Sequence, residues 1–471
     1  MNKKDIEIRK IRSLNQSIIE GSFASVMITV FDNYITPFAV ALKATAPQIG
    51  LIRSLPQLLG AFVQLFVPEL SDRLHARKRI VLLAALLQGI TCLLLFAAAL
   101  WIRNVEFVII SVALYGFFGA IISPLWSSWM GDLVPQQERG RYFGKRTAVT
   151  GIVTFFSIIV FGVFLEISSI YRGMSINLAF GLVFIIAFLA RLMSWQLLGR
   201  IYEPKYEVSP TSYFTFFDFL KRMPSNNFGR FVIFAFLMNI AVQISGPFFA
   251  VYVLQELHYN YIQYTVYTFA FAVASFVFMY YWGGHSDLYG NRMIFAITGL
   301  LTPVLPLLWL LTGNFWYIII IQIFGGFIWA GFNLSTSNYI YDAVTPQKRA
   351  RIFAYYNIMT GVGIFLGASI GGLLYQFIDK PWLFSSKFHL LFFVSAIARL
   401  LVVIIFLQRI KEVRTGVDNV RPEREMFLRL VVVEPSRTVM NGIVHGVEHK
   451  IYPTLRKELA NGFRQWKIKP K

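Results

Sequence analysis

An aspartate lies in the middle of the first long apolar stretch of this sequence. At helical spacing Asp32 shares one face with four other polar side chains, which are Ser25, Thr29, Asn33 and Thr36. A charge at the centre of a membrane-spanning helix costs about 2.5–3.5 kcal/mol on insertion scales, so it indicates a function or a partner. A carboxyl group there can bind and release a proton as its access to water changes. We interpret Asp32 as a proton-coupling residue; the alternative is a structural, hydrogen-bonded carboxyl group.

Further polar side chains lie on single faces of other apolar stretches. Arg53 and Gln57 are one turn apart in the second stretch. Arg53 either pairs with Asp32, or binds an anionic group of a substrate, or extends to the membrane surface as an interfacial arginine. The candidates that line a substrate cavity are Thr29, Asn33, Thr36, Arg53, Gln57, Asn239, Gln243, Trp329, Asn333 and Thr336. Arg191 and Arg399 lie near the ends of two stretches, and we expect their side chains to reach the surface and to be structural.

The sequence contains few residues suited to other chemistry. The single cysteine, Cys92, excludes an intramolecular disulfide, and no C-x-x-C motif or histidine cluster is present to bind a metal. No phosphate-binding Gly-x-x-x-x-Gly-Lys-Ser/Thr loop and no nucleophile–base set occurs within the apolar stretches. We therefore expect no enzymatic activity and no cofactor, and we expect any transport to be driven by a gradient or by a partner protein.

The composition explains where these residues must lie. The 471 residues are 56% hydrophobic and only 14% charged, with a mean hydropathy of +0.59. A soluble fold of this length cannot cover so much apolar surface with so few charges. Hydropathy predicts an all-α membrane protein with about twelve transmembrane helices. These lie near residues 18–42, 48–70, 79–101, 107–130, 147–167, 175–198, 231–254, 262–283, 293–312, 316–340, 352–377 and 386–408.

The net charge of +20 is distributed unevenly between the two sides of the predicted membrane. Most lysines and arginines fall in the N-terminus, in alternate loops and in the tail after residue 408. The loops on the other side contain few, namely Lys43, Arg53, Arg103, Arg172, Lys380 and Lys387. This bias predicts that both termini are cytoplasmic, that the basic residues are attracted to anionic lipid of the inner leaflet, and that no nucleic acid is a partner. We expect a monomer in the cell (plasma) membrane.

The two halves of the chain repeat each other about 210 positions apart. Asp132, Arg139 and Arg141 have the same spacing as Asp342, Arg349 and Arg351. Pro37-Phe38 matches Pro247-Phe248, and Ala190-Arg191-Leu192 matches Ala398-Arg399-Leu400. Such a long period indicates two related six-helix bundles. We expect an N-terminal segment 1–17, a first half 18–200, a linker 201–230, a second half 231–408 and a basic tail 409–471.

Two loop motifs resemble those of a known family. ELSDRLHARKR at 69–79 and GGHSDLYGNR at 283–292 are similar to the G-x-x-x-D-R-x-G-R-R/K signature of the major facilitator superfamily, and DLVPQQERGRYFGKR resembles its P-x-x-x-R-G-R segment. Glu69 and Ala76 depart from the first signature, and the fifth stretch lacks the Gly-Pro motif of drug–proton antiporters. The resemblance implies that Asp72 and Asp287 each lock one half against the other at a cytoplasmic gate. The repeated spacing favours a part in this gate for Arg139, Arg141, Arg349 and Arg351; the alternative is that these arginines only set the topology. The predicted gate residues are Asp72, Arg73, Arg77, Asp132, Arg139, Arg141, Asp287, Arg292, Asp342, Arg349 and Arg351.

These observations together predict a secondary transporter that moves a small organic solute by alternating access, with proton coupling through Asp32. Sparse charge on the polar faces favours a neutral or weakly amphipathic solute over a multiply charged one. Two other readings stay open at this point. One is an uncoupled facilitator, and the other is a membrane sensor or scaffold with the transporter fold that uses the basic tail.

Overall fold

The computed structural model describes residues 3–74, 76–134, 139–170, 174–204, 216–344, 349–377, 384 and 386–413. All regular structure in this part of the chain is helical, as predicted. Eleven helical segments are long and apolar enough to cross a membrane. The bent pair of segments Arg9–Asn33 and Ile35–Ala41 makes a twelfth if it is one span. The predicted all-α, multi-span architecture is therefore confirmed.

Long uninterrupted helices build the N-terminal half, because its apolar stretches contain few residues that break a helix. Their bounds are α1 (Lys3–Asn33), α2 (Ile35–Ala41), α3 (Ala46–Leu74), α4 (Arg77–Ala97), the π-helical turn η1 (Ala98–Ile102), α5 (Val105–Leu133), α6 (Arg139–Ile170) and α7 (Ile176–Arg200). The side chains of Asn104 and Ser175 accept from the backbone N–H groups of Phe107 and Leu178, and so cap α5 and α7.

The C-terminal half repeats this order with more breaks. Its elements are α8 (Phe216–Arg222), η3 (Met223–Ser225), α9 (Asn227–Gln243), α10 (Phe248–Val251), η4 (Tyr252–Glu256), α11 (Tyr261–Tyr289), α12 (Asn291–Leu301), α13 (Val304–Leu308), α14 (Phe315–Ala343), α15 (Arg349–Phe377), α16 (Lys387–Phe406) and η6 (Leu407–Arg409). Prolines 247 and 303 stand at the breaks before α10 and α13, because proline cannot continue the backbone hydrogen bonding of a helix.

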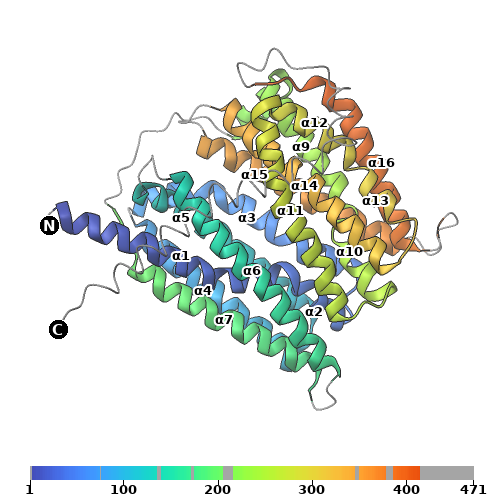
Figure 1. The fold of residues 1–471 in the computed structure, drawn as a ribbon, viewed down its shortest axis with the longest axis horizontal. Coiled ribbons are helices and arrows are strands. Elements are labelled where there is room, and N and C mark those ends of the chain that lie inside the picture. Colours follow the sequence, from blue (N-terminus) through green and yellow to red (C-terminus); the bar gives the residue numbers. More distant parts are fainter. Residues whose placement is uncertain are drawn as a thin grey trace, which may run out of the picture.

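The two halves lie side by side and meet along two helix pairs (Figure 1). The first pair is α3 with α15, and the second is α6 with α11. Glycines allow the close approach: a Cβ at Gly361 would overlap Ala61 and the Gln57 carbonyl, and a Cβ at Gly372 would overlap Pro47. The halves are thus packed backbone to backbone along α3 and α15.

One face of the molecule is closed by contacts between the halves. We call the side on which α1 begins the terminus face and the other side the opposite face. Near the opposite face, α2 contacts α10 and η4, and α3 also contacts α10 (Figure 1). Phe38 and Phe248 are fully buried there. The contacts of α2 and α3 with α10 and η4 therefore close the opposite face.

Candidate functional site

Asp32 lies beside a break in the first span. α1 and α2 meet at an angle of 43°, with the break at Tyr34. Pro37 has no N–H group, so it cannot bond the carbonyl oxygen of Asn33 four residues earlier. That oxygen instead accepts a hydrogen bond from the Tyr264 hydroxyl of α11, at 3.1 Å. The break next to Asp32 is thereby tied to the other half of the protein.

A first cavity of about 360 Å³ extends from Asp32 between α1, α3, α5 and α15. Arg53, Gln57 and Gln64 contribute polar atoms from α3, and Asn357 contributes from α15. The Asn357 amide donates to Gln64 Oε1 at 2.8 Å, which links the two halves at the wall of this cavity.

A second cavity of about 370 Å³ lies between α1, α3 and the helices of the C-terminal half. Asp32 and Arg53 line this cavity as well, so both cavities adjoin these two residues. Its other walls are mostly aromatic, and include Phe249, Tyr264, Tyr267, Phe271, Trp309 and Trp329. A cavity with apolar walls and a few convergent polar groups is the usual form of a small-molecule site.

The two charged residues shared by the cavities do not form a close ion pair. No nitrogen of the Arg53 guanidinium lies within 4 Å of an oxygen of the Asp32 carboxylate. Arg53 Nε donates to Thr36 Oγ1 at 3.0 Å. The Asp32 side chain is exposed despite its position in the middle of a span, because it faces the cavities. Both charges are therefore available to a bound solute or to water.

The structure brings some of the predicted cavity residues together and places others elsewhere. Asp32, Asn33, Arg53, Gln57 and Trp329 line one or both cavities, and Thr36 touches them through Arg53. The remaining candidates line neither cavity; they are Thr29, Asn239, Gln243, Asn333 and Thr336.

Most of those remaining side chains bond to their own helix or pack against a neighbouring helix. Thr29 and Asn239 donate to backbone carbonyls one turn earlier, at 2.7 and 2.8 Å. Gln243 packs against Gly367 of α15. Asn333 is exposed, and the Thr336 hydroxyl has no hydrogen-bond partner among the described residues.

The predicted gate residues of the N-terminal half bond within that half. Arg77 is buried and donates to Asp132 Oδ2 at 2.7 Å. The next residue, Lys78, binds the segment after α7: its N–H donates to Glu203 Oε1 at 3.1 Å and its Nζ to the Ile201 carbonyl at 2.8 Å. These bonds join the starts and ends of three helices into one cluster.

The C-terminal half contains the same arrangement. Asn291 donates to Asp342 Oδ2 at 2.6 Å. Arg292 donates its N–H to Glu412 Oε2 at 2.8 Å and its Nε to the Ile410 carbonyl at 2.7 Å. By these contacts Asn291 corresponds to Arg77, and Arg292 corresponds to Lys78.

The other predicted gate side chains lie outside the part of the chain that the structure describes. They are Asp72, Arg73, Arg139, Arg141, Asp287, Arg349 and Arg351. Their part in a gate stays a prediction.

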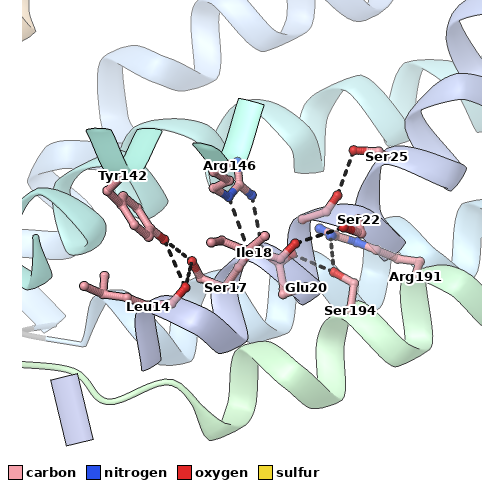
Figure 2. Close-up of polar contacts among 11 residues, drawn as sticks. Leu14, Ser17, Ile18, Glu20, Ser22, Ser25, Tyr142, Arg146, Arg191 and Ser194 are labelled. Carbon is pink, nitrogen blue, oxygen red and sulfur yellow. Dashed lines mark hydrogen bonds and ion pairs between the residues drawn. The ribbon is translucent and has the colours of Figure 1, made fainter. Parts of the chain in front are cut away.

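A buried charge cluster lies between α1, α6 and α7, and sequence reasoning missed its centre, Glu20 (Figure 2). Arg146 Nη2 contacts Glu20 Oε2 at 3.4 Å. Ser194 donates to Glu20 Oε1 at 2.8 Å and accepts from Arg191 Nη1 at 3.0 Å. Arg191 is only 4% exposed, so the expectation that it reaches the surface is wrong. An acidic residue at the start of an apolar stretch was the signal for this cluster.

Glu166 is a second carboxylate that the sequence analysis did not single out. It is buried in α6 near the opposite face, and its Oε2 accepts from the Tyr261 N–H at 2.8 Å. Tyr261 is the first residue of α11, so the carboxylate sits at the positive end of a helix dipole. The contact joins the two halves on the closed side.

Arg399 is also buried, at 2% exposure, and it lines the second cavity. The expectation that the Arg399 side chain reaches the surface is therefore wrong too. Its guanidinium donates to the Thr302 carbonyl at 3.0 Å. Pro306 leaves that carbonyl free, since it has no N–H to bond the residue four positions earlier.

The family model of the Major Facilitator Superfamily matches residues 21–223 and 231–466. The chain belongs to this superfamily. It is thus an integral, multi-pass membrane protein of the transporter type, and the match extends beyond the spans into the tail. No curated protein sequence matches the chain.

Solved structures share the fold of this superfamily member. The nucleoside transporter NupG is 14% identical, with 86% of this chain and 99% of that chain covered and a TM-score of 0.63. A D-xylose–proton symporter is 13% identical, with 87% and 98% covered and a TM-score of 0.62. A bacterial homologue of the iron transporter ferroportin in an inward-facing state is 13% identical, with 84% and 98% covered and a TM-score of 0.64.

Proposed function

We propose that this superfamily member is a secondary active transporter that moves a small organic solute by alternating access, with proton coupling through Asp32. The observation that supports this most is the position of Asp32. It is an exposed carboxylate in the middle of a span, at a helix break, and it borders both cavities. An ionisable group at that depth is a functional residue by default.

Charged and titratable side chains from several helices surround this carboxylate. Arg53 of α3, Tyr115 of α5, Tyr264 and Tyr267 of α11 and Arg399 of α16 line the two cavities with it. Protonation of Asp32 removes one negative charge from this set. Proton binding and solute binding therefore influence each other, which is the requirement for coupling.

The way in which the halves contact each other supports alternating access. The contacts that close the opposite face are separable, and they include the hydrogen bonds from the Tyr264 hydroxyl to the Asn33 carbonyl and from the first N–H of α11 to the Glu166 carboxylate. Breaking them allows the halves to rock about α3 and α15. We place the protein in the cell membrane with both termini cytoplasmic, as the distribution of basic residues predicts, so the terminus face is the cytoplasmic one.

Flux into proteoliposomes tests proton coupling. A thermal-shift screen of metabolites against the purified protein first identifies a solute that binds. Wild-type protein is expected to concentrate this solute only under an imposed pH gradient, and Asp32→Asn is expected to abolish concentration while leaving exchange. Glu106→Gln is the control, because Glu106 is an exposed carboxylate that bonds Gln48 away from both cavities. Concentration that is independent of the gradient, or that survives in Asp32→Asn, contradicts the proposal and favours an uncoupled facilitator.

A further inference from the structure

Arg399 is a buried cation with no anionic partner in the part of the chain that the structure describes. Its donors reach only neutral oxygens: Ser395 Oγ at 3.1 Å, Ser245 Oγ at 3.0 Å, the Thr302 carbonyl at 3.0 Å and the Val242 carbonyl at 3.4 Å. No described aspartate or glutamate lies within 4 Å of it. A buried charge that is hydrogen-bonded but not neutralised is costly to keep.

The related arginine of the other half is treated differently. Arg191, which matches Arg399 in the sequence repeat, reaches the Glu20 carboxylate through the Ser194 hydroxyl (Figure 2). Arg146 contacts the same carboxylate. The chain therefore supplies a carboxylate near Arg191 and leaves Arg399 without one. Arg191 lines neither cavity, whereas Arg399 lines the second.

A second arginine of the same cavity, Arg53, has N–H donors that no described hydrogen bond uses. A guanidinium has five N–H donors, and the described bond of Arg53 uses only its Nε, on Thr36. Arg53 and Arg399 are opposed in this cavity by one carboxylate, Asp32. The lining is therefore positively charged by one unit when Asp32 is ionised and by two when it is protonated.

From this charge pattern we propose that the second cavity binds an aromatic monocarboxylate, with the carboxylate held by Arg53 and drawn by the charge of Arg399. The aromatic walls, which include Trp309 and Trp329, contact the ring of the solute. A planar guanidinium with free donors matches a carboxylate geometrically. The inference rests on the proposed function, since it names the solute of the same cavity. It also explains the coupling: a protonated Asp32 leaves two uncompensated arginines, so proton and anion bind more tightly together than apart.

Three probes of similar shape and different charge test this assignment on the full-length purified protein. They are 3-phenylpropanoate, its neutral amide 3-phenylpropanamide, and the cation 3-phenylpropylammonium. Dissociation constants come from the concentration dependence of the melting temperature. We expect the carboxylate to bind at least about tenfold more tightly than either analogue, and its affinity to increase from pH 7.5 to pH 5.5.

Variants assign the preference to residues. Arg53→Gln is expected to reduce the carboxylate's advantage over the amide to less than about threefold, and Arg399→Gln to do the same. Because Arg399→Gln is in a buried position and can fail to fold, Arg399→Lys serves as a second variant that keeps the charge and is expected to keep most of the preference. Arg103→Gln is the control, since Arg103 is exposed and lines neither cavity.

Equal binding of the three probes, or a full preference in Arg53→Gln, overturns the assignment. These measurements use no gradient, so they separate this inference from proton coupling. A carboxylate preference in a protein whose flux ignores the pH gradient keeps the anion site and rejects the coupling. Gradient-driven flux of a solute that has no anionic group keeps the proton coupling and rejects the anion site.

Discussion

Glu166 gives the sharpest test of how the opposite face is closed. Its carboxylate is 7% exposed and accepts from the first N–H of α11 at 2.8 Å, across the boundary between the halves. A hydrogen bond to a charged group contributes about 1.5–3 kcal/mol, and a neutral one about 0.5–1.5 kcal/mol. Glu166→Gln keeps the acceptor and removes the charge. It should therefore weaken this contact by about 1 kcal/mol, and the contact exists only while the face is closed.

A weakening of about 1 kcal/mol raises the ratio of open to closed protein roughly fivefold. The assay is alkylation of a cysteine that closure hides. Thr265 is suitable because it is 6% exposed and packs against Gly162 of the other half. Thr265→Cys is introduced together with Cys92→Ser, which removes the only native thiol. We expect maleimide to react about fivefold faster in Glu166→Gln, and faster still in Glu166→Ala.

The matched control is Glu106→Gln. Glu106 also accepts one hydrogen bond, from Gln48 at 2.7 Å, but donor and acceptor both belong to the N-terminal half. This substitution should leave the alkylation rate unchanged. If Glu166→Gln and Glu106→Gln have equal effects, or if neither changes the rate, the carboxylate does not hold the face closed and our account of the closure is refuted.

Two predictions concern packing and buried charge. Gly162→Ala should lower the melting temperature by an amount equivalent to about 1–3 kcal/mol, because the added Cβ overlaps Thr265. Gly151→Ala on the same helix is the control and should be neutral, because its Cβ meets nothing within 4 Å. Equal effects of the two substitutions would contradict close packing of α6 on α11. Glu20→Gln should destabilise the protein by about 3 kcal/mol in thermal unfolding, because Arg146 loses its buried carboxylate. A melting temperature like that of Glu106→Gln would show that this cluster contributes little.

The sequence predicted the architecture well because the information for it is local. Each span is a continuous apolar stretch of roughly the thickness of a bilayer, so hydropathy locates it without knowledge of its neighbours. Asp32 was found for the same reason: a charge within such a stretch is unusual whatever surrounds it. The repeat was also visible, since Pro37 and Pro247 or Arg191 and Arg399 recur at a nearly constant distance.

The exact alignment of the two halves in this loop could be determined only from the side-chain contacts in the structure. Short motifs with several basic residues in a row, such as Arg77-Lys78-Arg79, align in more than one way. The structure shows that Lys78 and Arg292 bind the same backbone position after the last helix of each half, and this settles the alignment.

Side-chain environments depended wholly on the tertiary structure. By sequence, Arg191 and Arg399 were equivalent, and both were near enough to a helix end to reach water. In the packed structure both side chains are buried. Arg191 is linked to the Glu20 carboxylate through the Ser194 hydroxyl, whereas Arg399 lies beside a cavity and bonds neutral oxygens such as the Thr302 carbonyl. Glu166 likewise meets the start of α11, 95 positions away in the chain. Helical periodicity shows which face a residue shares, but only the packing of distant helices decides what that face meets.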